Sequence, residues 1–525
     1  MIKPICFYTT SLFFFLFSAR SLAIDDFSIV PVNRTNTFEV VDVQSIIDRL
    51  PPGERWITHL EDDLLKFWDM PTALGQPLGD FPTYRCNDGS LVNPDNICPE
   101  LTIDDPIVNL ARDYTRAKSR QVFAYGISYH LTGNEKYLSY AIAGADWLMN
   151  NVIDRYGAAS WIENGTPQPD NLQRTSQDMA YAVSGIAFLY YLTHDNLYLD
   201  QVEYLKNHIF RTYFDPQWGL LRWVREANSD GDSPLQKELV SQLDQIYGYM
   251  LWTTMALPEG ELKQSWLADL ERLAIAMRDQ FFGDTYGLYW GAITDMEKRN
   301  LANYQGVENP HTDFGHSIKT LWLTYRIGLL SGNTSLVNFA RPHMYNILGR
   351  AYIEDTGSWA RGFKPQSEGS TTWVLDPTKE WWSLAELDQT SATLALVDPI
   401  FARVLPQTYD YWFKYMVDHE HGGIWHMVDG QTNKPILKWP KQHSWKNAFH
   451  SFEHALIGYL TAQQLHGEPI TLYYAFANDV EVPDSALHPY LYQAEVLSRE
   501  NSKKRFKGSA LRQYQPTVVT FTSLH

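Results

Sequence analysis

The sequence predicts an all-α fold, an (α/α)6 barrel of six helical hairpins followed by a small C-terminal β extension. One loop type recurs about every 62 to 70 residues, with an acidic residue and a short gap before a glycine that has aromatic neighbours. The segments between these loops repeat apolar residues at the 3.6-residue period of a helix. Short and long connections alternate between the segments, which is typical of stacked helix pairs. The recurring glycines are Gly157, Gly219, Gly287, Gly357 and Gly422.

Twelve helices are expected, and breaker residues mark their ends. Turns within a pair are short, as at 132–135 and 331–334, whereas connections between pairs are long. Six units without an obvious capping repeat favour a closed ring over the alternative, an open solenoid. The expected helices span 41–67, 112–132, 136–153, 176–193, 197–214, 238–255, 260–282, 313–331, 335–353, 380–395, 399–416 and 447–465.

The helix after each long loop begins at one shared rim, and long loops on a rigid scaffold are where sites tend to form. Polar and aromatic side chains converging there from six segments would describe a carbohydrate pocket. A large aromatic core also accounts for most of the 18 Trp and 31 Tyr, so ring content alone does not decide. The first-turn residues are Arg120 with Tyr125, Asp178 with Tyr181, Asp244 with Tyr247, His316, Trp381 and Trp382 with Glu386, and Trp445 with His450.

His316 and His450 occupy equivalent positions in two repeats, which makes them the candidate acid/base pair. An imidazole has an unperturbed pKa of about 6.5, so it can take and return a carbon-bound proton for which a carboxylate is too weak a base. One histidine in a helix is more often structural, but two at one rim favour catalysis. Arg120 is the candidate electrophile for the oxygen that becomes negative, with an interhelical ion pair as the alternative.

Carboxylates at the same rim have two interpretations. Glu386 and Asp178 are expected to accept sugar hydroxyls, or to be the paired carboxylates of a glycosidase. The Asp-His-Glu-His run at 418–421, with His426, lacks a helical ligand spacing, so a solvated loop or a hydrogen-bonded lid is favoured over a metal site. The sequence contains no phosphate-binding loop, dinucleotide fingerprint or nucleophile elbow. We therefore expect neither a metal nor an organic cofactor.

Charge and the N-terminal segment restrict the partners. The formal net charge of −18, with Lys and Arg scattered, argues against nucleic acid or an anionic membrane. Lys3, an apolar run over 5–17 and small residues at 21–23 fit a secretory signal peptide over 1–23. The mature protein is then expected to be secreted or periplasmic, off the membrane, and a monomer or homodimer that binds a mono- or oligosaccharide.

The rest of the chain divides into two parts. The barrel is expected over 24–470, and an oxidising compartment would favour a disulfide between Cys86 and Cys98 within it. Residues 471–525 form the extension. Its strand-like runs are 473–476, 490–492 and 518–521.

Five stretches combine aromatic and ionisable residues in a recognisable order. They are 118–125 (KSRQVFAY), 315–318 (GHSI), 380–386 (Glu-Trp-Trp, then Glu386), 422–425 (GGIW) and 445–450 (WKNAFH). Together they resemble the N-acylglucosamine 2-epimerase family, which includes cellobiose 2-epimerases and mannose isomerases. The resemblance implies an (α/α)6 barrel, His316 and His450 as acid/base catalysts, and Arg120 as a substrate contact.

Two positions depart from the pattern of that family. Lys319 stands where the family usually has a glutamate, three residues after the first histidine. Glu453 stands where it usually has an arginine, three residues after the second. Because the two changes have opposite charge sense, we expect Lys319 and Glu453 to form a swapped ion pair across the mouth.

The residues and the resemblance predict a sugar 2-epimerase or aldose–ketose isomerase. One histidine would remove the C2 proton of an opened aldose, Arg120 would stabilise the enediolate, and the other histidine would return a proton. The alternatives are a glycoside hydrolase on the same barrel and a non-catalytic carbohydrate-binding relative. The expected sugar contacts are Trp381, Trp382, Glu386, Trp445, Asp178, Asp244 and Lys319.

Overall fold

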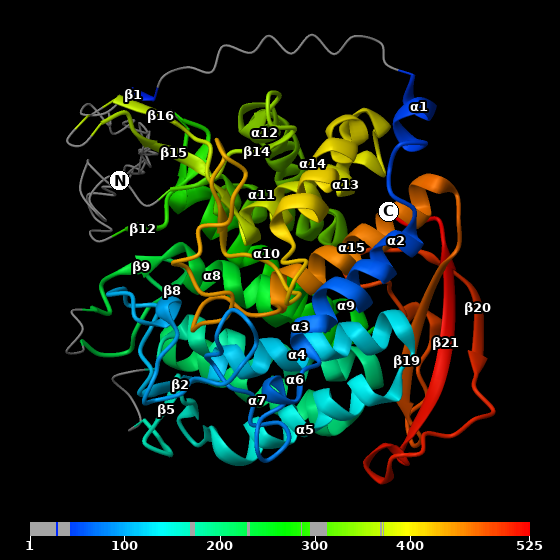
Figure 1. Cartoon of the computed structure of the whole chain (residues 1–525). Helices are drawn as coiled ribbons and strands as arrows, with labels where there is room; N and C mark the ends of the chain where they lie inside the picture. The colour runs from blue at the N-terminus through cyan, green and yellow to red at the C-terminus, as the bar shows by residue number, and fades with distance from the viewer. Residues whose placement is uncertain are drawn as a thin grey trace, which may run out of the picture.

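The computed structural model describes residues 28–29, 42–168, 174–227, 232–284, 286–293, 312–367, 370 and 372–525. The expected signal peptide at 1–23 lies outside the described residues. Figure 1 shows packed helices with short strands at the left end and a three-stranded sheet at the right end. None of the described helices is both long and apolar enough to cross a membrane.

The inner wall of the barrel consists of helices that are buried on every side. In α6 (Ser176–Thr193) all residues are buried, and in α4 (Thr115–Thr132) all but Thr132 are. Helices without an exposed face show little amphipathicity, which explains the mixed composition of these segments. The other inner elements are α8 (Leu239–Gln245), the π-helical turn η4 (Ile246–Met250), α9 (Leu251–Ala256), α11 (Phe314–Ser331), α13 (Trp381–Ala395) and α15 (Phe449–His466). The ring closes because α15 packs against α4.

The outer wall consists of helices that bury a single stripe. In α7 (Asn196–Tyr213) the buried positions recur mostly three or four residues apart, from Tyr198 to Tyr213. The other outer elements are α2 (Gly53–Thr58), η1 (His59–Leu64), α3 (Leu65–Trp68), α5 (Glu135–Asn151), α10 (Glu261–Phe281), α12 (Thr334–Ala351), η5 (Pro399–Val404), α14 (Leu405–Tyr411) and η6 (Trp412–Met416). Inner and outer elements alternate along the chain, and this confirms the predicted (α/α)6 barrel.

Three of the expected helices differ from the observed ones. The segment 41–67 is interrupted at Pro51 and Pro52, which separate α1 (Val43–Ile47) from α2, because proline lacks the N–H that a helix requires. The segment 238–255 contains η4, and 399–416 begins as the 3-10 turn η5 and ends as the π-helical turn η6. Apolar periodicity does not reveal these changes of helix type, because they are only one turn long.

The recurring glycine loops all lie at one end of the barrel, where the inner helices begin. Four of them form hairpins with very short strands, and in the fifth Val417 and Ile424 form an isolated bridge. All five glycines have positive φ, from 62° to 97°, a conformation that side-chain-bearing residues adopt only at a steric cost. The hairpins pair β3 (Ile153–Asp154) with β4 (Gly157–Ala158), β7 (Phe214–Asp215) with β8 (Leu220–Leu221), β10 (Phe282–Gly283) with β11 (Leu288–Tyr289), and β13 (Tyr352–Ile353) with β14 (Ser358–Trp359).

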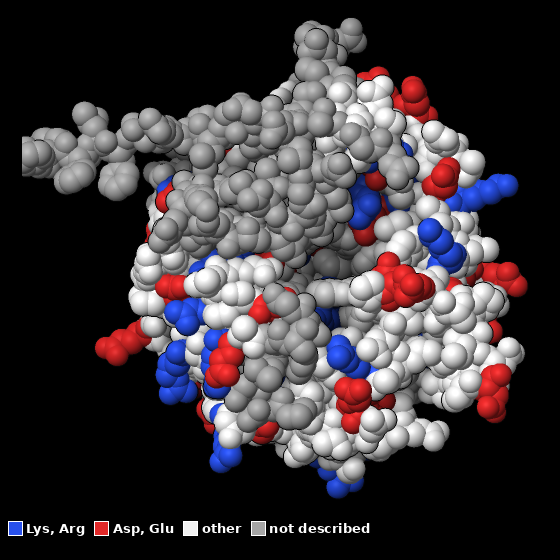
Figure 2. All heavy atoms as spheres, turned by 90° about the vertical axis from the view of Figure 1, so that its left-hand side faces the viewer, with Lys and Arg blue, Asp and Glu red and all other residues white. Residues whose placement is uncertain are grey.

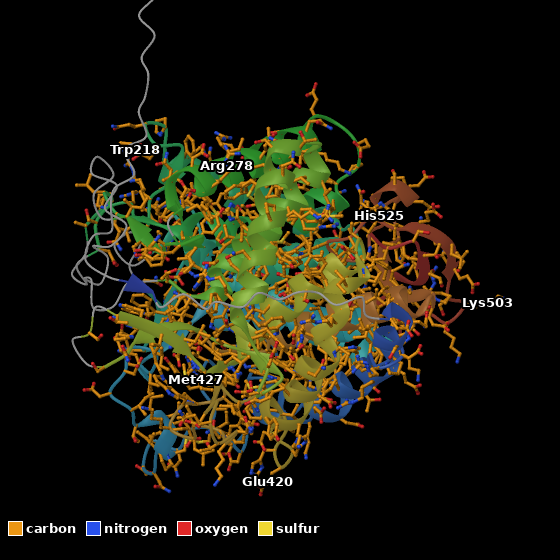
Figure 3. All side chains as sticks on the ribbon, turned by 90° about the horizontal axis from the view of Figure 1, so that it is seen from above. Trp218, Arg278, Glu420, Met427, Lys503 and His525 are labelled. Atoms are coloured by element: carbon orange, nitrogen blue, oxygen red, sulfur yellow. A yellow bond between two sulfur atoms is a disulfide. The ribbon has the colours of Figure 1, made fainter. Side chains whose placement is uncertain are left out.

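The C-terminal extension covers the opposite end of the barrel. Its strands β19 (Ile470–Ala477), β20 (Glu495–Asn501) and β21 (Tyr514–Thr522) form an antiparallel sheet in the order β19-β21-β20. In Figure 3, Lys503 and His525 lie toward this end, whereas Trp218 and Met427 lie toward the other. The predicted strands at 473–476 and 518–521 are confirmed, but the prediction at 490–492 is wrong. Those residues form a buried turn beneath the inner helices.

Candidate active site

The mouth of the barrel is the end at which the inner helices begin. Figure 2 looks onto this end and shows a hollow near the centre of the face. Lys or Arg side chains are visible inside the hollow, although the whole chain carries a formal net charge of −18. Cationic groups therefore lie within the hollow at the mouth.

His316 lies in the first turn of α11, which Asp313 caps. The Asp313 carboxylate accepts a hydrogen bond from the His316 backbone N–H at 2.6 Å and contacts its ring Nδ1 at 2.7 Å. This second contact fixes the orientation of the imidazole and engages Nδ1, which leaves Nε2 as the other ring nitrogen. The His316 ring packs on the indole of Trp382, with centroids 4.5 Å apart. Gly315 permits this packing, because a Cβ there would lie 2.4 Å from the indole.

His450 lies in the first turn of α15, and its Nδ1 faces into the protein. Nδ1 is 3.1 Å from the Tyr247 hydroxyl and 3.3 Å from Glu386 Oε1. Burial, and then the positive charge of Arg120 and other nearby cations, hold the pKa of His450 well below its usual value. At neutral pH the ring is therefore neutral, and Nδ1–H can donate to either neighbour while Nε2 keeps its lone pair.

The two histidines meet at Trp382. Its indole centroid is 4.5 Å from the ring of His316 and 6.1 Å from the ring of His450. The charge of His316 also acts on His450, as expected for neighbours in a poorly solvated pocket. The structure thus brings the predicted acid/base pair to one aromatic platform.

Below His450 lie two buried carboxyl groups. Glu453, one turn further along α15, accepts hydrogen bonds from the hydroxyls of Tyr247 and Tyr490, the latter at 2.5 Å, and from Gln389 at 3.4 Å. Burial raises the pKa of Glu453 and raises that of Glu386 to about 8, to which repulsion between the two carboxylates also contributes. Glu386 therefore carries a proton at neutral pH.

The same groups lie close enough together to be compared with a metal site. Ligand atoms of Glu386, His450 and Glu453 lie within 4.8 Å of one another. However, two tyrosine hydroxyls already donate to Glu453, and the Lys319 ammonium acts on both carboxyl groups. A divalent cation would have to displace these donors and approach an existing positive charge, so the donor set suits proton transfer better than metal binding.

Two predicted sugar contacts, Lys319 and Asp244, are paired with each other. Lys319 Nζ is 3.5 Å from Asp244 Oδ1, and Gln177 donates to the other carboxylate oxygen at 2.6 Å. The expected ion pair between Lys319 and Glu453 is wrong, because within the described part of the chain these groups are not within 4.0 Å. The ring of Tyr247 stands beside Lys319, at 4.3 Å from Nζ, and its hydroxyl reaches Glu453 instead.

Arg120 and Trp445 meet at the entrance. Arg120 Nη1 donates to the Trp445 carbonyl at 3.2 Å, and its guanidinium lies 4.4 Å from the ring centroid of Tyr181. No described carboxylate lies within 4.0 Å of it, so the alternative of an interhelical ion pair is not observed. Asp178 is held differently, in an ion pair with Arg116, whose guanidinium lies 3.6 Å from the Trp445 ring centroid. Arg120 is thus oriented by rings and one carbonyl.

Proteins of similar sequence or fold include cellobiose 2-epimerases and a D-mannose isomerase. No protein-family model matches the sequence. A curated cellobiose 2-epimerase from Bacteroides fragilis is 23% identical over 351 residues, which cover 63% of this chain and 84% of that protein. A cellobiose 2-epimerase structure from Bacillus thermoamylovorans B4167 has a TM-score of 0.62 at 18% identity, covering 78% of this chain and 98% of the other. A D-mannose isomerase structure has a TM-score of 0.59 at 15% identity, covering 78% and 97%.

The chain is thus similar in sequence to a protein named cellobiose 2-epimerase, and similar in fold to proteins named cellobiose 2-epimerase and D-mannose isomerase. The solved structures establish the shared barrel fold. Each of these two structures is matched over almost its whole length, whereas about a fifth of this chain has no counterpart in them.

Of the other residues that resemble the family, Trp381 lies behind the pocket. Its ring packs at 4.7 Å against His426, which is 3.1 Å from His443. His426 therefore belongs to a buried pair with His443 and does not form a cluster with residues 418–421. In that run Asp418 binds Lys441 at 2.5 Å and accepts backbone N–H groups of its own loop, as the hydrogen-bonded interpretation predicts.

The predicted disulfide between Cys86 and Cys98 is present, and its loop supports the loop that leads to His450. Arg85 Nε donates to Gln442 Oε1 at 2.8 Å, and the Gln442 amide donates back to the Pro82 carbonyl at 2.6 Å. Arg85 is fully buried, so these bonds form away from solvent, where they are stronger. The segment that leads to His450 is thus stabilised by the disulfide-linked loop, a contact that the family resemblance did not indicate.

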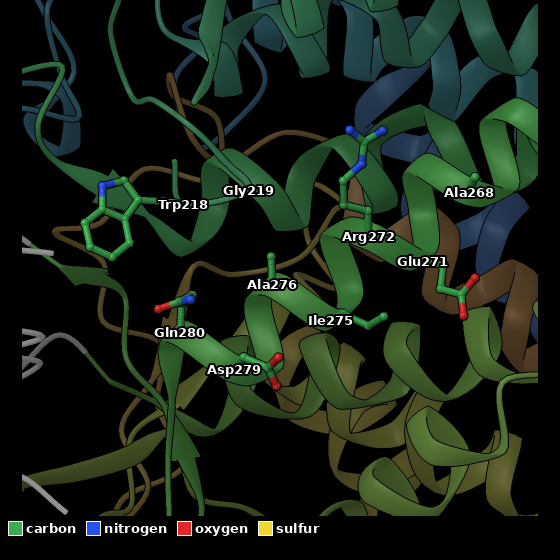
Figure 4. A pocket seen from close by; sticks show the side chains of 9 residues that line it. All are labelled: Trp218, Gly219, Ala268, Glu271, Arg272, Ile275, Ala276, Asp279 and Gln280. Atoms are coloured by element: carbon green, nitrogen blue, oxygen red, sulfur yellow. The ribbon is translucent and has the colours of Figure 1, made fainter. Parts of the chain in front are cut away.

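A second hollow lies on the outer wall, against α10. It measures about 460 Å³ and is lined by Trp218, Gly219 and residues of α10 such as Glu271 and Gln280 (Figure 4). None of the predicted site residues lines it. The outer hollow is therefore separate from the hollow at the mouth of the barrel.

Sequence reasoning missed two residues beside the histidines. Asp313 had a usable signal, since an aspartate immediately before a helical pattern is a frequent N-cap. Tyr490 had none, because it comes from the extension and reaches Glu453 only through the tertiary fold. Tyr247 was placed at the rim, but its link between His450 and Glu453 was not foreseen.

Replacing Glu386→Gln should make stability less dependent on pH between about 4.5 and 8. A carboxyl whose pKa is raised on folding binds its proton more tightly in the folded state. Its favourable contribution is therefore complete below the unfolded pKa and is lost as the pH rises through about 8. Urea unfolding at several pH values should show wild type losing stability relative to Glu386→Gln as the pH rises. The exposed Glu420→Gln serves as the control, and equal pH slopes for wild type and both variants would contradict the expectation.

Proposed function

We propose that this protein is a sugar 2-epimerase or aldose–ketose isomerase that moves the C2 proton between two histidines. The proposal rests on the placement of His316 and His450 around the indole of Trp382. The relatives named cellobiose 2-epimerase and D-mannose isomerase support the same class of reaction. A sugar stacked on Trp382 would present its carbons to an imidazole on either side.

The environment of His450 suits a general base. Because its pKa is depressed, the imidazole is neutral, and a donating Nδ1 leaves Nε2 available to remove the C2 proton. The imidazolium that results is linked through the Tyr247 hydroxyl to Glu453, and this link favours the charged state as it forms. The imidazole of His450 is thus unprotonated before the reaction, and its imidazolium form is stabilised once it has taken the proton.

The enediolate needs positive charge close to its oxygens. Arg120 has no described carboxylate partner and is oriented over Tyr181, so its guanidinium donors are available to a substrate oxygen. His316, whose Nδ1 is held by Asp313, then delivers a proton through Nε2. Delivery to C2 from the opposite face gives the epimer, whereas delivery to C1 gives the ketose.

Deuterium incorporation tests the proposal directly. The purified protein is incubated in deuterated water with mannose, glucose, N-acetylhexosamines and cellobiose, and C2 is followed by NMR. We expect loss of the C2 proton signal and appearance of an epimer or ketose. Cleavage of cellobiose without exchange would indicate the hydrolase instead, and binding without exchange or cleavage would indicate a carbohydrate-binding protein.

We also propose that the protein is exported, since its disulfide between Cys86 and Cys98 would persist best in an oxidising compartment. N-terminal sequencing of the protein from culture medium or periplasm should find the chain beginning near residue 24. An intact N-terminus in the cytosol would overturn this.

A further inference from the structure

Part of the C-terminal extension enters the floor of the barrel. Residues 488–492 follow β19 and turn upward between the inner helices, and Tyr490 is fully buried with a positive φ of 60°. The Tyr490 backbone N–H donates to the Tyr191 hydroxyl at 2.8 Å, and that hydroxyl donates to the His488 carbonyl at 2.5 Å. A left-handed backbone at a tyrosine is unfavourable, so this conformation is maintained by its surroundings.

The ring of Tyr490 fits among aromatic side chains of the inner wall. It stacks on Trp252 with centroids 5.6 Å apart and lies 6.3 Å from both Phe123 and Phe188. These contacts fix the direction of the phenol. Its hydroxyl then donates to Glu453 Oε1 at 2.5 Å.

From Glu453 a chain of contacts leads to the base. The other oxygen of Glu453 accepts the Tyr247 hydroxyl, and Tyr247 lies 3.1 Å from His450 Nδ1. Tyr247 and His450 also stack, with an interplanar angle of 22°. Each member of the chain is buried, so no water competes for these bonds and a change at one end reaches the other.

We propose that Tyr490 is a positioning residue of the active site, supplied by the C-terminal extension. Its hydroxyl holds Glu453, and Glu453 through Tyr247 holds the imidazole of His450 with Nε2 toward the substrate. This inference rests on the proposed function, in which His450 is a base. Tyr490 itself is fully buried and acts through other residues.

The groups around Glu453 predict how its protonation responds. It faces Tyr247 from η4, Gln389 and Glu386 from α13, Lys319 from α11 and Tyr490 from the extension. The Tyr490 hydrogen bond lowers the pKa of Glu453, so its loss should raise that pKa. The carboxyl would then stay protonated to higher pH, and the acid side of the pH–rate profile should move upward.

Tyr490→Phe in the full-length protein tests the proposal, with Tyr492→Phe as the matched control. Tyr492 is also fully buried in the same turn, but its hydroxyl pairs with Thr393. We expect Tyr490→Phe to lower kcat for C2 exchange about 10- to 100-fold, with KM changed less than about twofold and the acid limb shifted upward. Tyr492→Phe should lower Tm by a similar amount and leave kcat and the pH profile unchanged.

Equal kinetic effects of the two variants, or a lower kcat with an unmoved pH profile, would overturn the proposal in favour of a packing role. If Tyr490→Phe does not fold, 3-fluorotyrosine at position 490 keeps the ring and makes the hydroxyl more acidic. A stronger hydrogen bond to Glu453 should then lower the pKa of Glu453, and the acid limb is expected to move downward.

If wild type shows no C2 exchange, the proposed function has failed, and a titration decides about Tyr490 separately. Carboxyl ¹³C resonances of glutamate-labelled protein report Glu453 without turnover. They should show a higher pKa for Glu453 in Tyr490→Phe than in wild type. An unchanged titration would overturn the positioning role.

Discussion

His450→Gln should abolish epimerisation and reduce proton removal by this base about 10²- to 10⁴-fold. Glutamine approximates the size of the imidazole and can still contact Tyr247, but it cannot accept a proton at neutral pH. Stopped reactions in deuterated water, followed by NMR at C2, measure the loss for each epimer.

Because two bases serve opposite faces, the His316→Gln variant should show the complementary defect. The epimer whose C2 proton faces His450 should still exchange with solvent in His316→Gln, and the other epimer should still exchange in His450→Gln. Neither variant should interconvert the two sugars. Exchange of both epimers in either variant would show that one base serves both faces, and the two-histidine mechanism would be wrong.

His454→Gln is the control for both. His454 lies one turn beyond His450 on α15, is equally buried, and is 3.1 Å from Asp388, away from the pocket. This change should affect Tm more than exchange. A kinetic loss as large as that of His450→Gln would mean that helix packing, and not the base, accounts for the effect.

Glu453→Ala should lower the free energy of unfolding by about 2 to 6 kcal/mol, because two buried hydroxyls lose their acceptor and each loss costs about 1 to 3 kcal/mol. Tyr247 and Tyr490 both donate to this carboxyl, and neither can turn to solvent. Urea unfolding followed by fluorescence gives the change in stability.

Glu453→Gln separates hydrogen bonding from charge. The amide oxygen can still accept one tyrosine hydroxyl, so the loss should be less than half that of Glu453→Ala. If the two variants are equally destabilised, the negative charge near Lys319 matters more than the two hydroxyls, and Glu453 does not stabilise the floor chiefly as a hydrogen-bond acceptor.

Much of the barrel was predictable because its signals are local. The inner helices end at short breaker turns, and the five glycines that set the repeat are the positions where a hairpin needs positive φ. Likewise His316 and His450 were identified from their equivalent places in two repeats. Local pattern therefore located the rim and the two histidines that we propose as the acid/base pair.

The contacts between elements were not predictable. Lys319 was matched with Glu453 by charge sense alone, yet the helix geometry places Asp244 nearer and sets the ring of Tyr247 beside the ammonium. The π-helical turns add a residue within an otherwise regular pattern, and apolar spacing tolerates that change. Tyr490 was assigned to a strand because its aromatic neighbours resemble one, while burial in the floor determines its actual conformation.

The place of residues 488–492 in the sequence has a consequence for biosynthesis. They follow every barrel helix, so the ribosome releases them only after the helical ring has been made. Until then the cavity left by Tyr490 exposes Trp252 and the carboxyl of Glu453 to water from below. Under the proposed function, a ring that has not yet received this turn lacks the hydroxyl that holds Glu453, and insertion of the turn completes the floor beneath His450.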